Sequence, residues 1–266
     1  MSTVLITGAS SGIGHDLAMV FAEHGHDLII TSRGLEPLQR LAAVCTRQFS
    51  VNVRVIAKDL ADAAAPQQIC DELAASSTAV DCLVNNAGFG SHGPFAQSNL
   101  DTELSILNVN VRALMQLTHL LLPQMIQRRH GRILNVASTA AYVPGPYMST
   151  YYASKAFVLS HSVALNRELR RYGVTVTALC PGPTNTNFQQ RAGMTASKLF
   201  RFGAMSPLTV ARFGYRAMMR GKMIAIPGLH NRLGAALSRL CPYWLSSIVT
   251  ARLNGQPKVA VEKSDS

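Results

Sequence analysis

The chain has 266 residues, of which 48% are hydrophobic and 15% charged, and its formal net charge is +11. This length and composition allow one large hydrophobic core, which excludes a disordered protein. The five cysteines lack metal-like spacing, strand-like sequence begins within three residues of the N-terminus, and no run of about 20 apolar residues occurs, so we expect a reduced, cytoplasmic protein without a metal site, signal peptide or spanning helix.

Short apolar runs alternate with helical patterns along the chain, which predicts a parallel sheet of about seven strands between two helical layers, an α/β/α fold. The predicted strands are Val4–Thr7, Leu28–Ser32, Val51–Ala57, Cys82–Asn85, Arg132–Ala137, Val174–Cys180 and Met223–Ile226. The longest predicted helices are Thr102–Arg129 and Tyr151–Tyr172. Because no repeat or linker interrupts this pattern, we expect a single domain over residues 1–255 and a disordered tail over residues 256–266.

A glycine-rich turn follows the first predicted strand, with Gly8, Gly12 and Gly14 in the spacing Gly-x-x-x-Gly-x-Gly. A helical pattern begins directly after it. The N-terminus of a helix exposes unpaired N–H groups and a partial positive charge, which suit a pyrophosphate, and glycines let the backbone approach the phosphate. The turn predicts a dinucleotide site, and a plain strand-to-helix turn is the alternative.

The second predicted strand ends at Thr31 and Ser32 and is followed by Arg33, with no carboxylate at that end. In dinucleotide folds an acidic residue here holds the ribose 2′-hydroxyl of NAD, whereas an arginine accommodates the 2′-phosphate of NADP. The pattern therefore favours NADPH over NADH. A solvated loop arginine is the alternative.

Tyr151 and Lys155 stand four residues apart, which places them on the same face if the segment is helical. A phenol normally holds its proton until about pH 10. A neighbouring cation favours the phenolate, so we expect Lys155 to bring the pKa of Tyr151 toward neutrality and to make it a proton donor or acceptor.

Together these motifs resemble the short-chain dehydrogenase/reductase family, in its single-domain, NADP(H)-preferring form with a Rossmann-type doubly wound parallel sheet. The resemblance covers roughly residues 3 to 190 and rests on the glycine turn, Asp59-Leu60, Asn85-Asn86-Ala87-Gly88, Asn110, Ser138, Tyr151, Lys155 and Pro181-Gly182 followed by Thr186. One departure is Ser11, which stands where many NADPH-preferring members carry a basic residue.

The resemblance implies a role for each motif residue. Tyr151 would be the general acid in reduction, and Lys155 would hold the nicotinamide ribose. Ser138 would donate a hydrogen bond to the substrate oxygen, and Asn110 would kink its helix and hold a water beside Lys155, with Asn108 as the fallback. The implied cofactor contacts are Gly8, Ser10, Ser11, Gly12, Ile13, Gly14, Ser32, Arg33, Asp59, Leu60, Asn86, Ala87, Gly88, Tyr151, Lys155, Pro181, Gly182, Thr184 and Thr186. Simpler roles stay open for Ser138 as a strand end, Asn86 as a brace between strand ends, and Asp59 as a helix cap.

The family places a substrate lid at residues 187–207, a stretch rich here in Phe and Met. We expect a large apolar pocket that takes a lipophilic substrate. The predicted pocket residues are Phe89, Phe95, Tyr147, Met148, Phe188 and Met194. These residue types also serve in ordinary packing.

Positive charge is concentrated late in the chain: residues 1–190 hold 13 Lys/Arg and 12 Asp/Glu, whereas residues 191–266 hold 12 Lys/Arg and two acidic residues. Such a segment attracts an anionic partner, such as a phosphate-bearing substrate, acyl-CoA, an acidic carrier protein or lipid, and no nucleic-acid-reading motif is present. Within it, residues 229–253 form a basic amphipathic pattern. This segment can lie on a membrane, cover the substrate cleft or pack on a partner subunit, and ordinary packing is the alternative.

We therefore expect an NADPH-dependent carbonyl reductase or alcohol dehydrogenase for a lipophilic ketone, 3-oxoacyl thioester or steroid. A non-catalytic NADP(H)-binding scaffold or sensor, and a protein that mainly binds membranes or partners, are the other functions considered. The resemblance also implies a homodimer, with a tetramer as the alternative, formed through the two long helices. Apolar positions in these helices beyond those one sheet face needs are Leu114, Leu117, Leu121, Phe157 and Val163.

Overall fold

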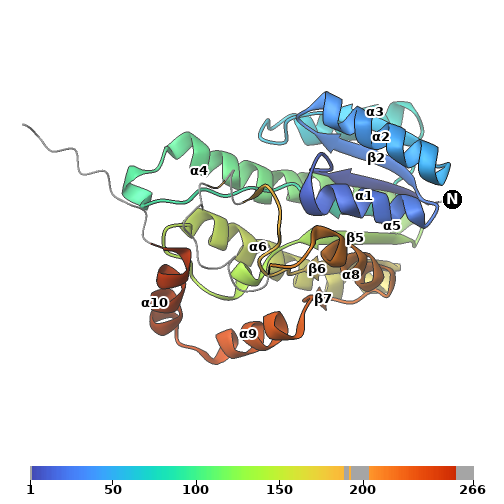
Figure 1. Cartoon of the computed structure of the whole chain (residues 1–266). Helices are drawn as coiled ribbons and strands as arrows, with labels where there is room; N and C mark the ends of the chain where they lie inside the picture. The colour runs from blue at the N-terminus through green and yellow to red at the C-terminus, as the bar shows by residue number, and fades with distance from the viewer. Residues whose placement is uncertain (1, 189–191, 193–203, 256–266) are drawn as a thin grey trace, which may run out of the picture.

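A computed structural model describes residues 2–188, 192 and 204–255, and these residues form a seven-stranded parallel sheet with helices on both faces (Figure 1). The strand order is β3-β2-β1-β4-β5-β6-β7. The strands are β1 (Thr3–Thr7), β2 (Asp27–Ser32), β3 (Val53–Ala57), β4 (Cys82–Asn85), β5 (Gly131–Val136), β6 (Val174–Leu179) and β7 (Ile224–Ala225). The predicted fold class is confirmed, with strand limits that differ by one or two residues.

The central strands are continuous apolar runs because both of their faces are covered. In β1, Val4 and Ile6 join one hydrophobic cluster and Leu5 joins the other, and none of the three is exposed. Alternate side chains therefore serve opposite cores, as the period of a strand requires. The first layer contains α1 (Gly12–Glu23), α2 (Leu35–Phe49) and α8 (Pro207–Met219); the second contains α3 (Ala65–Ala75), α4 (Leu100–Leu107), α5 (Leu114–Gln127) and α6 (Ser149–Leu169).

The first of the two predicted long helices is interrupted. Between α4 and α5 the chain forms a π-helical turn, Asn108–Ala113, and the second helix ends in a 3₁₀ turn at Arg170–Tyr172. A π-turn widens the helix by one residue and is frequent at functional sites. Here it directs Asn110 into the interior, where 1% of the residue is exposed.

Three of the apolar positions expected on a subunit interface are instead buried within the chain. Leu114, Leu117 and Leu121 are 6%, 0% and 2% exposed, because they pack against the sheet. Phe157 does reach the surface, as do Leu104 and Met115 of the helices α4 and α5. The homodimer stays a prediction.

The chain continues beyond β7 into α9 (Leu229–Leu240) and α10 (Tyr243–Asn254), which lie apart from the two layers, at the lower left of Figure 1. Within the described residues, no helix has the length and apolar character needed to cross a bilayer. Most of the predicted lid (187–207) and the predicted disordered tail (256–266) lie outside the described residues.

Candidate active site

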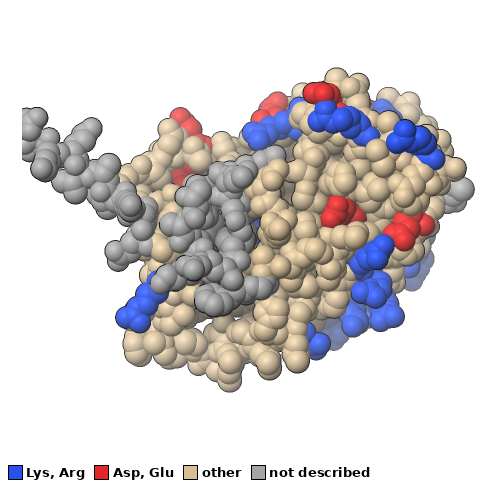
Figure 2. All heavy atoms as spheres, viewed as in Figure 1, with Lys and Arg blue, Asp and Glu red and all other residues tan. Residues whose placement is uncertain are grey.

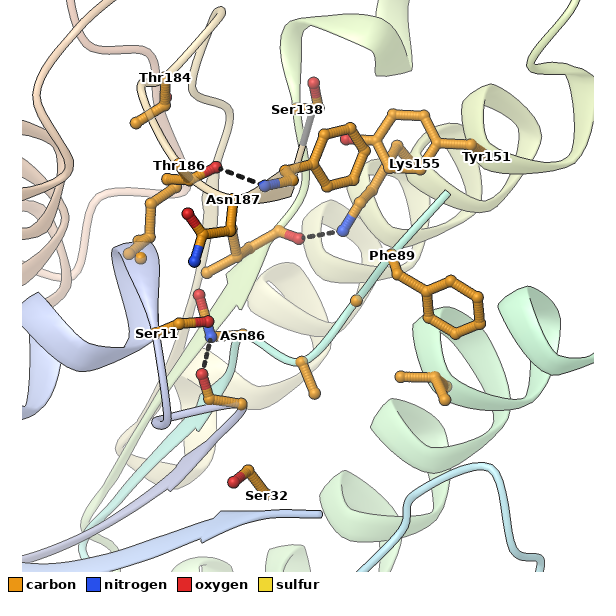
Figure 3. Close-up of a pocket in the computed structure, with 18 of the residues that line it drawn as sticks. Ser11, Ser32, Asn86, Phe89, Ser138, Tyr151, Lys155, Thr184, Thr186 and Asn187 are labelled. Atoms are coloured by element: carbon orange, nitrogen blue, oxygen red, sulfur yellow. Dashed lines mark hydrogen bonds between the residues drawn. The ribbon is translucent and has the colours of Figure 1, made fainter. Parts of the chain in front are cut away.

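A cavity of about 860 Å³ opens at the carboxyl ends of the strands (Figure 3). Loops after β1, β2, β3, β4, β5 and β6 contribute to it, as expected where strand order reverses beside β1. Predicted residues that line it are Gly8, Ser10, Ser11, Gly12, Ile13, Ser32, Arg33, Asp59, Leu60, Asn86, Ala87, Gly88, Ser138, Tyr151, Lys155, Pro181, Gly182, Thr184 and Thr186. Motifs from across the sequence therefore meet in one cavity.

The glycine turn has two different functions. Gly8 and Gly12 have φ angles of +65° and +58°, and both line the cavity, so the backbone here adopts a conformation that favours glycine. Gly14 does not line the cavity: a Cβ there would lie 2.3 Å from the carbonyl oxygen of Gly8 and 2.3 Å from Nδ2 of Asn86. Gly14 lets α1 pack against the turn, and the cofactor contact at Gly14 stays a prediction.

The N-terminus of α1 has the properties needed to hold a dinucleotide phosphate. Ser11 is its N-cap but makes no side-chain capping bond, and no acidic residue lies in the first turn. The first N–H groups of the helix thus keep their partial positive charge for an anion at the cavity wall. A pyrophosphate fits this arrangement.

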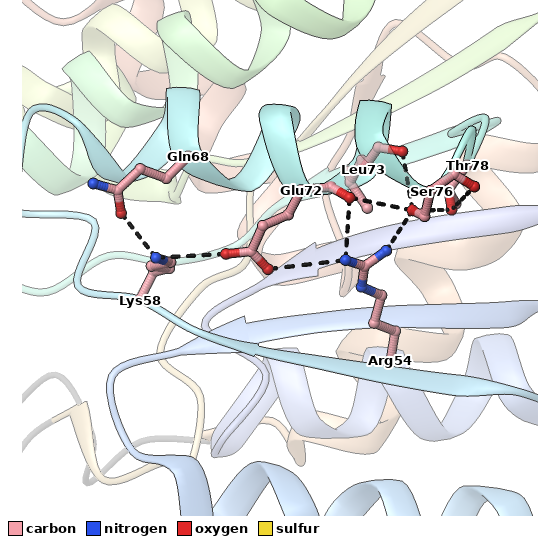
Figure 4. Close-up of polar contacts among 7 residues, drawn as sticks. All are labelled: Arg54, Lys58, Gln68, Glu72, Leu73, Ser76 and Thr78. Atoms are coloured by element: carbon pink, nitrogen blue, oxygen red, sulfur yellow. Dashed lines mark hydrogen bonds and ion pairs between the residues drawn. The ribbon is translucent and has the colours of Figure 1, made fainter.

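Two cations lie where the adenosine end of a dinucleotide would be placed. Arg33 is exposed at the end of β2 and lines the cavity beside Ser32. Lys58 follows the neighbouring strand β3 and also lines the cavity, and sequence reasoning missed it although its place after a strand was a usable signal. Its ammonium is held by Gln68 at 2.8 Å and by Glu72 at 3.5 Å (Figure 4), so its charge is partly neutralised.

Tyr151, Ser138 and Lys155 converge at the other end of the cavity. Figure 3 shows the Tyr151 hydroxyl directed toward Ser138, with Lys155 one helical turn further along α6. The Ser138 Oγ accepts from the Ala140 N–H at 3.1 Å, which fixes its rotamer. The ring of Phe188 covers that of Tyr151 at 5.1 Å, so the phenol is shielded from water.

The pKa of Tyr151 does not follow the prediction. Burial raises the pKa of Tyr151 above its usual range, and the hydrogen bond with Ser138 lowers it only in part. The Lys155 Nζ lies 5.8 Å from the centre of the phenol ring and donates a hydrogen bond to the Val136 carbonyl at 2.8 Å. Burial lowers the pKa of Lys155 to about 8. The expected shift of the Tyr151 pKa toward neutrality is therefore wrong in this structure, because burial raises the pKa more than the hydrogen bond with Ser138 lowers it.

Asn110 lies behind the cavity wall rather than on it. Its Nδ2 donates to the Phe89 carbonyl and to the Ser154 hydroxyl, both at 3.0 Å. A Cβ on Gly88 would lie 3.0 Å from Oδ1 of Asn110 and 3.2 Å from Nζ of Lys155, so the amide and the ammonium flank the same small space. Asn110, and not the less buried Asn108, has the predicted position.

The simpler alternative for Asn86 has direct support, whereas the helix cap considered for Asp59 is wrong, because α3 begins at Ala65 with Ala64 as its N-cap. The Asn86 Nδ2 donates to the carbonyls of Thr7 and Gly8 at 2.9 and 3.2 Å, which braces β1 against β4. Asp59 accepts from the Ala61 N–H at 3.0 Å and closes a turn. Both residues still line the cavity, so bracing and ligand contact are compatible.

The structure brings some of the predicted substrate-pocket residues to the cavity and leaves others away from it. Phe89, Met148 and Phe188 line the cavity. Phe95 does not, because it lies 63% exposed in a short 3₁₀ turn, and Tyr147 turns instead toward His92, with their ring centres 6.4 Å apart. Met194 lies outside the described residues.

Comparisons with known proteins agree with this geometry. The family model for short chain dehydrogenase matches residues 2–196. Sulfoacetaldehyde reductase 2 of Chromohalobacter salexigens is 37% identical over 70% of this chain and 73% of its own. A short-chain dehydrogenase from Sphingobium yanoikuyae in complex with NADPH has a TM-score of 0.81 and 33% identity, over 90% of this chain and 95% of the other.

A second solved structure is similar over the same extent. The bulky-bulky ketone specific alcohol dehydrogenase from Comamonas testosteroni has a TM-score of 0.77 and 30% identity, over 90% of this chain and 93% of the other. The NADPH complex supports NADP(H) as the predicted cofactor. The chain belongs to the short-chain dehydrogenase family, which confirms the predicted resemblance and the predicted class of enzyme, an NAD(P)-dependent oxidoreductase.

Proposed function

We propose that the chain is an NADPH-dependent reductase that converts a lipophilic ketone into a secondary alcohol. The observation that carries the proposal is the meeting of the Tyr151 phenol, the Ser138 hydroxyl and the Lys155 ammonium at one end of a cavity whose other end carries Arg33. Proton donor, oxygen-binding group and phosphate-binding cation are thus held in one space.

When bound, NADPH supplies the hydride that reduces the carbonyl carbon. Ser138 donates a hydrogen bond to the carbonyl oxygen and stabilises the negative charge that develops there. Tyr151 gives its proton to that oxygen, which completes the alcohol. Burial keeps the phenol protonated at neutral pH, which is the form that reduction of a carbonyl requires.

The walls of the substrate end support a lipophilic substrate. Phe89, Met148 and Phe188 line the cavity there and are apolar, as the walls of a site for a lipophilic ligand are. The named relatives differ, one acting on a small charged aldehyde and one on bulky ketones, so the proposal rests on these side chains. Contact with an acidic carrier protein would extend the substrates to 3-oxoacyl thioesters.

The expected location and assembly are part of the same proposal. We place the protein in the cytoplasm as a homodimer, with the exposed apolar residues of α4 and α5 at the subunit contact. Sedimentation of the purified protein tests the dimer. A tetramer is the alternative assembly.

The test of catalysis is Tyr151→Phe, with Tyr152→Phe as the matched control. We expect Tyr151→Phe to lower kcat for ketone reduction by roughly 10²–10⁴-fold. The affinity for NADPH, measured by fluorescence titration, should be unchanged. Tyr152 follows Tyr151 in α6, but its hydroxyl bonds Asn254 instead, so Tyr152→Phe should keep most turnover. Wild-type turnover in Tyr151→Phe would contradict the proposed proton donor. If neither the wild type nor the variant reduced any ketone, the result would favour the scaffold alternative.

A further inference from the structure

The helix α10 buries polar residues and exposes apolar ones. Ser246, Thr250 and Asn254 recur every four residues along its inner face and are 6%, 8% and 0% exposed. The outer face carries large apolar side chains, which are Trp244, Leu245, Ile248, Val249 and Leu253, exposed by 37–67%. A helix on a water-exposed surface has the opposite arrangement.

The helix α9 repeats this inversion. Its buried residues are Asn231 and Ala235, at 9% and 5% exposure. Its outer face is a row of leucines at helical spacing, namely Leu229, Leu233, Leu237 and Leu240, exposed by 57–85%. Two successive helices thus expose apolar stripes, and a contiguous apolar surface of this kind marks an interaction site.

Hydrogen bonds hold α10 in this orientation. The Thr250 hydroxyl donates to the Pro144 carbonyl at 2.6 Å, and the Asn254 Nδ2 donates to the Pro146 carbonyl at 2.8 Å. The Tyr152 hydroxyl donates to the Asn254 Oδ1 at 3.0 Å. Rotating α10 to bury its apolar face would leave these groups unpaired, so the outward apolar stripe is the stable arrangement.

The charges around the stripe are of one sign. The cations within the two helices are Arg232, Arg239 and Arg252, and no acidic residue occurs between residues 204 and 255. In Figure 2 the edge formed by α9 and α10 is mostly tan, with blue near its ends and no red. A second copy docked by two-fold symmetry would bring two such positive segments together without a carboxylate to pair them. An anionic lipid surface complements them.

The first turn of α10 carries the aromatic residues typical of a membrane interface. Tyr243 and Trp244 are 77% and 67% exposed there, and such rings prefer the headgroup level of a bilayer. We propose that α9 and α10 bind in the plane of an anionic membrane, with their leucines and Trp244 in the acyl boundary and their arginines at the headgroups.

Trp244 is the only tryptophan of the chain, so it reports directly on this contact. With the full-length protein we expect a shift of its emission to shorter wavelength on addition of phosphatidylcholine vesicles containing phosphatidylglycerol, and quenching by brominated lipid in the same vesicles. Vesicles of phosphatidylcholine alone should bind less, and high salt should weaken binding to the anionic vesicles. Emission that is already at short wavelength and unchanged by vesicles would show a protein surface over Trp244 and would overturn the proposal.

Variants with paired substitutions separate the contribution of the leucines to vesicle binding from that of the arginines. Leu233→Gln with Leu237→Gln should weaken vesicle binding by at least about tenfold, and Arg232→Gln with Arg252→Gln should weaken binding to anionic vesicles by roughly tenfold or more. The matched control is Leu35→Gln with Leu208→Gln, which changes two leucines of similar exposure on α2 and α8 and should bind as wild type. Equal binding by all three pairs would overturn the proposal.

The membrane contact bears on the proposed function because α10 is bonded to Tyr152, which lines the cavity with Met148. Membrane binding would thus hold the substrate end of the cavity near a lipophilic ketone dissolved in the bilayer. We expect the leucine pair to lose turnover of a ketone supplied in vesicles and to keep turnover of a water-soluble ketone. Because the Trp244 emission is independent of turnover, failure of the membrane contact is distinguishable from failure of the proposed catalysis.

Discussion

The cavity and the C-terminal helix pair bury polar groups for opposite reasons. At the cavity, an ammonium, a phenol and an amide are held inward at positions where burial shifts the pKa of Lys155 and Tyr151. In α9 and α10, neutral hydroxyls and amides are buried with complete hydrogen bonds while leucines face outward. At the cavity, burial of ionisable groups is unfavourable, and the resulting pKa shifts serve the chemistry. In α9 and α10, the buried polar groups attach the helices to the rest of the protein, and the apolar side chains remain exposed for a non-aqueous partner.

The largest expected effect comes from making the same change, Gly→Ala, in both regions, which tests the difference between them. At Gly14 the new Cβ meets the backbone carbonyl of Gly8 at 2.3 Å, so the turn must move. We expect a loss of about 3 kcal/mol in the free energy of unfolding and no measurable NADPH binding. At Gly234, inside α9, a Cβ meets nothing within 4 Å, so Gly234→Ala should stabilise the chain by about 0.5–1 kcal/mol. Urea unfolding of both variants checks the sign, and destabilisation by both would contradict the assigned difference.

The second prediction concerns the phosphate-binding end of the cavity. Arg33→Ala should lower the preference for NADPH over NADH by roughly 10- to 100-fold, because a charge-assisted hydrogen bond to the 2′-phosphate contributes about 1.5–3 kcal/mol. Titration of both cofactors by fluorescence measures the ratio. Arg40→Ala, on the exposed face of α2, is the matched control and should leave the ratio unchanged. An unaltered ratio of NADPH to NADH affinity in Arg33→Ala would show that other residues determine the preference for NADPH.

The third prediction uses the pKa of Lys155. Because burial lowers this pKa from 10.5 to about 8, the folded chain loses the proton first as pH rises, and the unfolded chain binds more protons between pH 8 and pH 10.5. Stability from this residue therefore rises with pH in that window, and the cost of burying the charge is fully present below pH 8. Lys155→Met should remove that cost.

We expect Lys155→Met to be inactive yet more stable than wild type by about 1–2 kcal/mol at pH 7, after allowing for the bond to the Val136 carbonyl that is lost. The gain should shrink as pH rises from 8 toward 10. Buried thiols such as Cys82, whose pKa is raised to about 12, act in the opposite sense, so the informative quantity is the difference between variant and wild type at each pH. A constant difference would contradict a titrating Lys155.

The sequence predicted the sheet and most of the cavity because strand ends in a parallel sheet meet at one edge, and the motif residues follow those ends. The sequence was misleading where a residue type can serve more than one function at the same position. Gly14 has the spacing of a phosphate contact, and the structure shows its close packing against the turn, which the spacing did not indicate. Phe95 looks like a pocket residue but lies in an exposed turn. The period of residues 229–253 predicted helices correctly, as α9 and α10 show. It did not show that the apolar face points outward, because periodicity alone does not say which face meets the protein.

The smallest expected effect sharpens the account of the two cations at the adenosine end. Glu72 lies 3.5 Å from Lys58 and 3.9 Å from Arg54, in a partly exposed network. Glu72→Gln removes the competing carboxylate and leaves Lys58 free to approach a 2′-phosphate. Because partly exposed ion pairs contribute about 0.2–1 kcal/mol, NADPH should bind roughly twofold more tightly while NADH affinity stays the same. The gain should disappear in the double variant with Lys58→Met, and a gain that persists there would show that the carboxylate acts on the cofactor without Lys58.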